Sequence, residues 1–218
     1  VEGMEAVLIK DTAEAKKVID TGKVPLIVDP DGASITALKP DVVVDAILAK
    51  KNLGTNHSMA PLTVGLGPGF TAGVDVDIVI ETMRGHNLGR IIREGSAIPN
   101  TGIPGNIGGY TAERVIHAGA EGILYNVHKI GDIVEQGEEI AYIAGEKENR
   151  RYSVTATIPG IIRGLIRDGY PVTKGFKIAD IDPRKSELSN CFTISDKARC
   201  IAGSVLEVVC AFGSNILS

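Results

Sequence analysis

Two stretches in the second half of the chain, AGAEGILYNVHKIGDIVEQGEEIAYI (118–143) and ATIPGIIRGLIRDGYPVTKGFKIADI (156–181), repeat one pattern. Each copy is predicted to form short strands that are separated by glycine turns. A unit this small cannot cover its own apolar face, so the two copies must pack on each other. Matching glycines lie 38 positions apart throughout: Gly122 and Gly160, Gly131 and Gly169, Gly137 and Gly175.

The doubled pattern resembles the biotinyl/lipoyl-like barrel-sandwich hybrid over 118–183. In carrier members of that superfamily, the hairpin between the halves presents a modified lysine in a Met-Lys-Met or Asp-Lys-Ala context. The corresponding stretch here is AGEKENRRYS (144–153), in which the single lysine, Lys147, stands between two glutamates. Because the carrier motif is absent, we expect a structural or docking barrel without covalent biotin or lipoate.

The first half of the chain alternates short apolar strands with helical patterns. This order predicts an α/β domain with a Rossmann-like, mostly parallel sheet, in which ligands bind beyond the carboxyl ends of the strands. The β-branched run Val42 to Val44 suggests a strand that is buried on both faces. The predicted strands end near Ile9 or cover 24–30, 42–44, 61–66 and 75–83, and the predicted helices cover 11–20 and 35–38.

Three glycines in PLTVGLGPGF (61–70) follow one of these strands, and Pro68 stands between the last two. Glycine accepts positive φ and has no Cβ, so Gly65, Gly67 and Gly69 favour either a stiff turn or a backbone that a ligand can approach. The spacing matches neither the dinucleotide-binding fingerprint nor a P-loop. The glycines alone therefore do not separate these two interpretations.

Cationic and amide side chains are expected at the same sheet edge, because they follow the neighbouring strands. Backbone amides and guanidinium groups together make an anion site. We favour this interpretation over ordinary solvated surface charges, although His86 taken alone suits a hydrogen-bonding loop residue. The predicted ligand-binding residues are Lys50, Lys51, Asn52, Gly65, Gly67, Gly69, Arg84, His86, Asn87 and Arg90.

The cysteines are the other chemical feature, and all three, Cys191, Cys200 and Cys210, lie near the C-terminus. A helix capped by Ser195 or Asp196 is predicted to follow Cys191, with Lys197 and Arg199 in its first turn and Cys200 and Cys210 as packing thiols inside it. Its predicted apolar positions are Ile201, Val205, Val208 and Val209. A thiol near a helix N-terminus and cations has a lowered pKa, which makes Cys191 a candidate catalytic nucleophile. The alternative is that Cys191 is a small buried hydrophobic residue.

The composition argues against some classes of protein. A net charge of −4 argues against a nucleic-acid binder. No apolar run approaches the length needed to span a bilayer, no signal-peptide pattern opens this sequence, and the odd number of cysteines leads us to expect a reducing cytoplasm. We expect four parts: an α/β domain (1–95), a Gly/Pro-rich connection (96–115), the barrel (116–183), and a C-terminal segment (184–218) that packs back on the α/β domain.

Several blocks together are similar to the accessory proteins of selenium-dependent molybdenum hydroxylase systems, the YqeB type. The resemblance covers nearly the whole chain and implies a bacterial cytoplasmic factor that helps to mature such a hydroxylase. Members of that family begin with a GGGDLATG-like Rossmann opening, so we expect an N-terminal piece to be missing before Val1. The blocks include KPDVVVDAILAKKNLGT, PLTVGLGPGFTAGVDVDIVIETMRGHNLGR, NTGIPGNIGGY and CFTISDKAR.

Three hypotheses follow from these observations. The first is a maturation factor that binds an anionic nucleotide or molybdopterin-type ligand at the glycine loop. The second is a selenium or sulfur transferase that uses Cys191, and the third is a non-catalytic docking platform. The expected partners are the hydroxylase or its maturation machinery. No metal site is predicted, and the cofactor, the enzymatic status and a homo-oligomeric state stay open.

Overall fold

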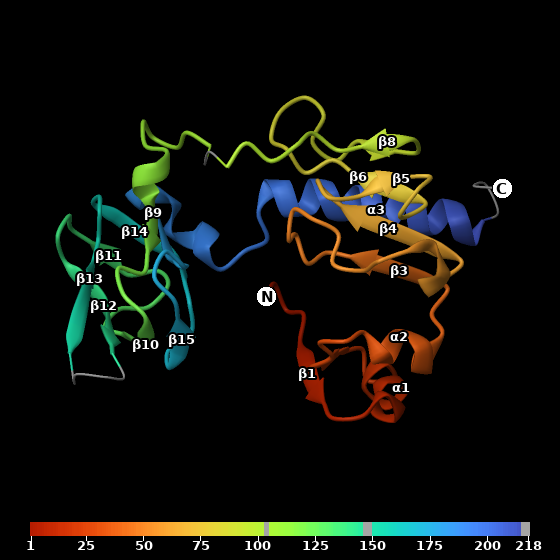
Figure 1. Ribbon diagram of the computed structural model, residues 1–218, viewed down its shortest axis with the longest axis horizontal. Helices are drawn as coiled ribbons and strands as arrows, with labels where there is room; N and C mark the ends of the chain where they lie inside the picture. Colours follow the sequence, from red (N-terminus) through yellow and green to blue (C-terminus); the bar gives the residue numbers. More distant parts are fainter. Residues whose placement is uncertain (103–104, 146–149, 215–218) are drawn as a thin grey trace. The chain divides into compact units, whose positions relative to one another are not determined.

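The computed structural model describes residues 1–102, 105–145 and 150–214. The chain divides into two compact units, unit 1 (Val1–Thr101 with Ile194–Ser218) and unit 2 (Gly102–Thr193). Figure 1 shows both units as mixtures of short strands with few helices. In the part of the chain that is described, no helix is both long and apolar enough to cross a membrane.

Unit 1 begins with a parallel strand pair, β1 (Ala6–Ile9) and β2 (Val24–Ile27). The connection between them is a 3-10 turn, η1 (Thr12–Glu14), followed by α1 (Ala15–Ile19). Asp11 caps this helical segment in a capping box with Glu14, as the predicted helix start at Asp11 requires. The helix α2 (Ala33–Leu38) follows β2.

The central sheet of unit 1 has the order β3-β4-β6-β7. Its strands are β3 (Val42–Asp45), β4 (Leu62–Leu66), β6 (Ile78–Ile80) and β7 (Ile91–Ile92). The first three run parallel and β7 runs antiparallel to β6. Val44 of β3 is exposed, so the prediction of a strand buried on both faces is wrong.

Short elements connect these strands, in place of the crossover helices of the Rossmann-like domain that the sequence predicts. The links hold η2 (His57–Met59) and β5 (Thr71–Ala72), and β5 pairs with β8 (Gly95–Ser96), which follows β7. The strand predicted over 75–83 is confined to Ile78–Ile80, because the chain leaves the sheet after Ile80. The fold is therefore a mixed α/β structure with several small sheets.

The long helix α3 (Asp196–Gly213) completes unit 1. Ser195 caps it, since its side chain accepts a hydrogen bond from the amide of Ala198. Ile201 and Val208, two of the predicted apolar positions, are buried in one cluster with residues of β4 and β6. Because the helix covers one side of the central sheet, its first turn is brought to the strand ends of the same unit.

Unit 2 consists of two four-stranded antiparallel sheets, β13-β12-β10-β15 and β11-β14-β16-β9. Short 3-10 segments, η3 (Ala112–Arg114) and η4 (Lys185–Cys191), precede and follow them. The strands of the first half of the unit are β9 (Val115–His117), β10 (Gly122–Asn126), β11 (Ile133–Val134) and β12 (Glu139–Ala144). Those of the second half are β13 (Arg151–Thr155), β14 (Gly160–Leu165), β15 (Tyr170–Val172) and β16 (Lys177–Asp182).

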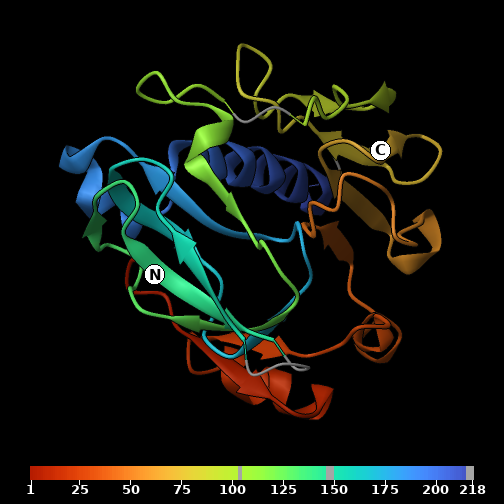
Figure 2. The same ribbon diagram turned by 60° about the vertical axis from the view of Figure 1, so that its left-hand side comes forward.

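The two halves of unit 2 are interlocked, and their hydrogen bonds are reciprocal. The amide of Gly131 donates to the carbonyl of Ile162, and the amide of Gly169 donates to the carbonyl of Leu124. Both glycines have positive φ, 96° and 70°. These two glycines therefore occupy equivalent turns, which confirms the prediction that the repeated sequences fold alike. Figure 2 shows the two sheets from a second direction.

Candidate functional site

The carboxyl ends of β3, β4 and β6 lie side by side, because these strands are neighbours and run parallel. Asp45 is the last residue of β3, and Gly65 pairs with it in register. Glu81 follows the last residue of β6 directly. This sheet edge, which we call the carboxyl edge, holds the predicted glycine loop.

The glycine loop is packed closely against its neighbours. A Cβ on Gly65 would lie 2.5 Å from the ring of Phe70, and one on Gly67 would lie 2.5 Å from Oγ1 of Thr82. Gly67 has a φ of 82°, and its amide already donates to the carbonyl of Ile80. All three glycines are therefore required by packing, because a Cβ on Gly69 would lie 2.6 Å from the backbone of Lys51. Gly67 and Gly69 also have positive φ. Only Gly69 is exposed.

Two buried carboxylates hold the loops of the carboxyl edge. Glu81 is 2 % exposed and accepts hydrogen bonds from the amides of Met83 and Ile98, at 2.6 and 2.8 Å. Asp45 accepts from the amide of Ile47 and from the hydroxyl of Thr55. A buried carboxylate that receives such hydrogen bonds orders the segments that donate them.

Three cationic side chains from separate segments come together at this edge. Lys50 lies in the loop after β3, Arg84 in the loop after β6, and Lys197 in the first turn of α3. Burial lowers the pKa of Lys197, and the charges of Arg84 and Lys50 lower it further, whereas Glu81 raises it. Arg84, Lys50 and Glu81 are therefore close enough for their charges to act on Lys197.

One of these cations is held in a defined position, and the loop of another has unusual backbone geometry. The guanidinium of Arg84 forms a two-pronged ion pair with Asp196, with N–O distances of 2.8 and 2.9 Å. Lys50 has a φ of 63°, and Leu48 in the same loop has a φ of 57°. Left-handed backbone at residues other than glycine is strained, and such strain is concentrated at functional sites. The arrangement can hold an anionic group between fixed positive charges.

The other predicted residues have different surroundings. The backbone of Lys51 lies against Gly69, so this segment follows β3 by several residues rather than ending it. Asn52 bonds to the backbone of Gly54 and Thr55 in its own loop. Asn87 accepts from Arg90, and His86 is exposed between Arg84 and Arg90. The structure does not test whether these side chains bind a ligand, and their assignment stays a prediction.

The sequence reasoning missed Asp45 and Glu81. The signal was present, because an acidic residue follows each β-branched run directly, in VVVD (42–45) and IVIE (78–81). An acid at that place lies at the carboxyl edge of a parallel sheet. Lys197 lies in the first turn of α3, where the helix dipole does not favour a cation, and Glu81 is a nearby carboxylate.

Cys191 lies at the end of η4 in unit 2 and is half-buried. Burial raises the pKa of its thiol and Asp182 adds to the rise, whereas Arg163 opposes it. This direction is opposite to the lowered pKa that the sequence suggested, because the effect of burial is larger than that of Arg163.

The two helical cysteines also differ from their prediction. Cys200 and Cys210 were expected to be packing thiols inside α3, but both are exposed. Their positions on the helix lie off the face that carries Ile201 and Val208 toward the sheet.

Lys147 lies outside the described residues. Within 1–102, 105–145 and 150–214, no group of three or more His, Cys, Asp or Glu side chains could hold a metal ion.

Comparison with known proteins identifies one similar sequence. The chain is 52 % identical over 209 residues to the uncharacterized protein YqeB of Escherichia coli (strain K12). The match covers 96 % of this chain but 37 % of that protein. No model of a known protein family matches the chain.

Similar solved structures are distant. An aspartoacylase family protein from Mesorhizobium loti shares 12 % identity, with coverage of 82 % of this chain and 51 % of that chain and a TM-score of 0.32. A succinylglutamate desuccinylase/aspartoacylase from Rhodobacter sphaeroides shares 22 % identity over 32 % of this chain and 22 % of that chain, with a TM-score of 0.30. Scores this low carry no conclusion about fold or activity.

Proposed function

We propose that the chain is part of an accessory factor for a selenium-dependent molybdenum hydroxylase, and that its carboxyl edge binds the anionic group of a nucleotide or molybdopterin-type ligand. The observation that carries the binding role is the convergence of Lys50, Arg84 and Lys197 from three separate segments. The similarity to YqeB over 96 % of the chain supports the family resemblance. Because the chain spans 37 % of that protein, the activity of the whole protein is part of the proposal.

The electrostatic reason for binding is the mutual repulsion of the three cations. Burial and two like charges lower the pKa of Lys197, so its protonated form is disfavoured without a counter-ion. A phosphate placed among the three groups would remove that penalty and accept charge-assisted hydrogen bonds. Glu81 and Asp196 offset part of the repulsion, but Glu81 is already held by two backbone amides and Asp196 is paired with Arg84. These residues therefore fit a phosphate in charge and in donor type.

The test is a titration of this chain with pyrophosphate, ATP and molybdopterin-type ligands at fixed ionic strength, followed by calorimetry. Lys197→Met should weaken binding at least tenfold, because it removes one phosphate-directed charge and leaves the aliphatic stem. The matched control is Arg93→Met, which removes an exposed charge of the same unit away from the edge. Equal affinities for the two variants, or no binding of any anion at millimolar concentration, would refute the binding role.

Unit 2 has its own part in the proposal. We propose that it is a barrel-sandwich hybrid with a structural or docking role, supported by the repeated sequence and by the reciprocal hydrogen bonds of Gly131 and Gly169. Mass spectrometry of the protein from its native host should find no biotin or lipoate on Lys147. Detection of either group would show that unit 2 is a carrier.

A further inference from the structure

A histidine of unit 2 lies between two carboxylates. Nδ1 of His128 is 3.2 Å from Oδ2 of Asp132, and Nε2 of the same ring is 3.2 Å from Oε1 of Glu138. The histidine side chain is only 23 % exposed, so solvent screens these contacts incompletely. We call these three residues the charged triad. Neither the anion-binding role of unit 1 nor the docking role of unit 2 uses them.

The backbone fixes both carboxylates of the charged triad. Oδ2 of Asp132 accepts a hydrogen bond from the amide of Lys129 at 3.0 Å, and Oε2 of Glu138 accepts one from the amide of Glu135 at 2.8 Å. The carboxylate of Glu135 is itself paired with Lys185 of η4, at 2.8 Å. The charged groups around the imidazole are therefore its two carboxylate partners, the adjacent Lys129, and the outer pair of Glu135 with Lys185.

The internal repeat provides a reference for the charged triad. The amides of His128 and Ile166, 38 positions apart, donate to the carbonyls of equivalent isoleucines in β12 and β16, so the backbone is the same in both halves. The counterparts of the charged triad are Ile166, Tyr170 and Phe176. Tyr170 and Phe176 stack with ring centroids 5.7 Å apart, and Ile166 and Tyr170 pack against the core. The fold therefore does not require ionisable side chains at these places.

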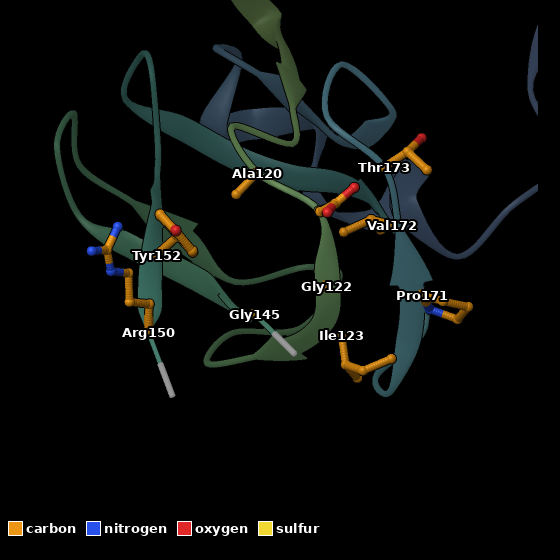
Figure 3. A pocket seen from close by; sticks show the side chains of 10 residues that line it. Ala120, Gly122, Ile123, Gly145, Arg150, Tyr152, Pro171, Val172 and Thr173 are labelled. Atoms are coloured by element: carbon orange, nitrogen blue, oxygen red, sulfur yellow. The ribbon is translucent and has the colours of Figure 1, made fainter. Parts of the chain in front are cut away.

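The charged triad flanks an edge strand. The strand β11 lies between Asp132 and Glu138 in the chain and is the outer strand of its sheet, where it pairs with β14. The amide of Ile162 in β14 donates to the carbonyl of Asp132 at 2.9 Å, directly before β11 begins. The counterpart of β11 is β15, the outer strand of the other sheet, and Figure 3 shows Val172 of β15 beside Gly122 of β10.

Both contacts of the imidazole require a proton on each ring nitrogen. Neutral imidazole has one N–H, so it donates to one carboxylate and presents a lone pair to the other. The amide of Lys129 lowers the pKa of Asp132 below its ordinary value and His128 lowers it further, although burial opposes both. Asp132 therefore stays ionised near neutral pH, where histidine is the side chain that ordinarily changes its charge.

We propose that the charged triad is a pH-sensitive clamp on β11, closed by the imidazolium of His128 and opened when that proton is lost. The closed clamp connects the residues on either side of β11 through one ring. When the pH rises, one of the two contacts is lost, and β11 separates from β14 more often. The stacked rings at the other edge do not titrate in this range, so the response is confined to one edge of unit 2.

Amide hydrogen exchange of the full chain, followed by NMR from about pH 5.5 to about pH 8, tests the clamp. The amide of Ile162 reports on the β11 edge, and that of Leu124, which pairs with Tyr170 in register, reports on the β15 edge. Exchange rates are divided by the intrinsic rate at each pH, which gives protection factors. The protection of Ile162 relative to Leu124 should fall about fivefold as the pH rises, because one hydrogen bond is lost.

Three variants complete the test. His128→Ile, which copies the counterpart Ile166, should make the ratio of protection factors independent of pH. Glu138→Gln keeps an oxygen that accepts from the amide of Glu135 but removes one charge, and it should reduce the change. His117→Gln, the matched control, removes an exposed histidine of the same unit and should leave the change intact. A ratio that is constant with pH in the unaltered chain, or that changes equally in His128→Ile, would overturn the proposal.

Discussion

Replacement of Gly67 by alanine tests whether the glycine loop is a structural turn or a surface for ligand. Gly67 has a φ of 82°, and a Cβ there would lie 2.5 Å from Oγ1 of Thr82. Gly73, with a φ of 80° and no atom within 4 Å of its Cβ position, is a matched control. Both substitutions impose the same backbone penalty, so their difference isolates the collision with Thr82.

The magnitudes follow from these contacts. A residue with a Cβ in left-handed backbone costs about 1–2 kcal/mol, which is the whole effect expected for Gly73→Ala. Overpacking against a buried side chain adds about 1–3 kcal/mol. Gly67→Ala should therefore destabilise unit 1 by about 2–5 kcal/mol in total. In the double variant Gly67→Ala with Thr82→Ala, the colliding hydroxyl and methyl group are absent. Its loss of stability should therefore fall to that of Gly73→Ala.

The assay is urea unfolding together with amide hydrogen exchange of Val64, which is fully buried in β4 and reports on unit 1 alone. Separate reporting matters because the two units need not unfold together. If Gly67→Ala costs no more than Gly73→Ala, the packing argument is wrong. A stable Gly67→Ala variant that no longer binds pyrophosphate would show that the glycine is there for ligand.

Two further outcomes are expected in unit 2. The guanidinium of Arg184 lowers the pKa of Asp182 from 3.8 to about 2. The ionised carboxylate therefore stabilises the folded state above pH 4, and this contribution is lost as the pH falls through 2. Asp182→Asn should abolish about 2 kcal/mol of pH dependence in that window, and an unchanged pH profile of unfolding would contradict the assignment. Since burial raises the pKa of Cys191, iodoacetamide should label it more slowly than the exposed Cys200 and Cys210, and faster labelling would revive the transferase hypothesis.

The sequence determined the features that depend on local backbone conformation. The paired glycines of the repeat marked turns with positive φ, and their constant spacing was sufficient to predict that both copies fold alike. The cap at Ser195 and the apolar positions Ile201 and Val208 likewise predicted the start of α3 and its buried face. Such patterns are readable because they involve residues within a few turns of one another.

Only the tertiary structure decided which distant residues share an environment. The repulsion among Lys50, Arg84 and Lys197 arises because α3 returns to the central sheet after the chain has passed through unit 2. The sequence alone was compatible with Gly67 in a structural turn and with Gly67 in a ligand-binding surface. The structure places Thr82 beside it, which favours the structural turn. The same holds for Cys191, whose pKa depends on burial and on Asp182 rather than on the cations that follow it in the chain. Burial and charge act through space, and neither is encoded in sequence spacing.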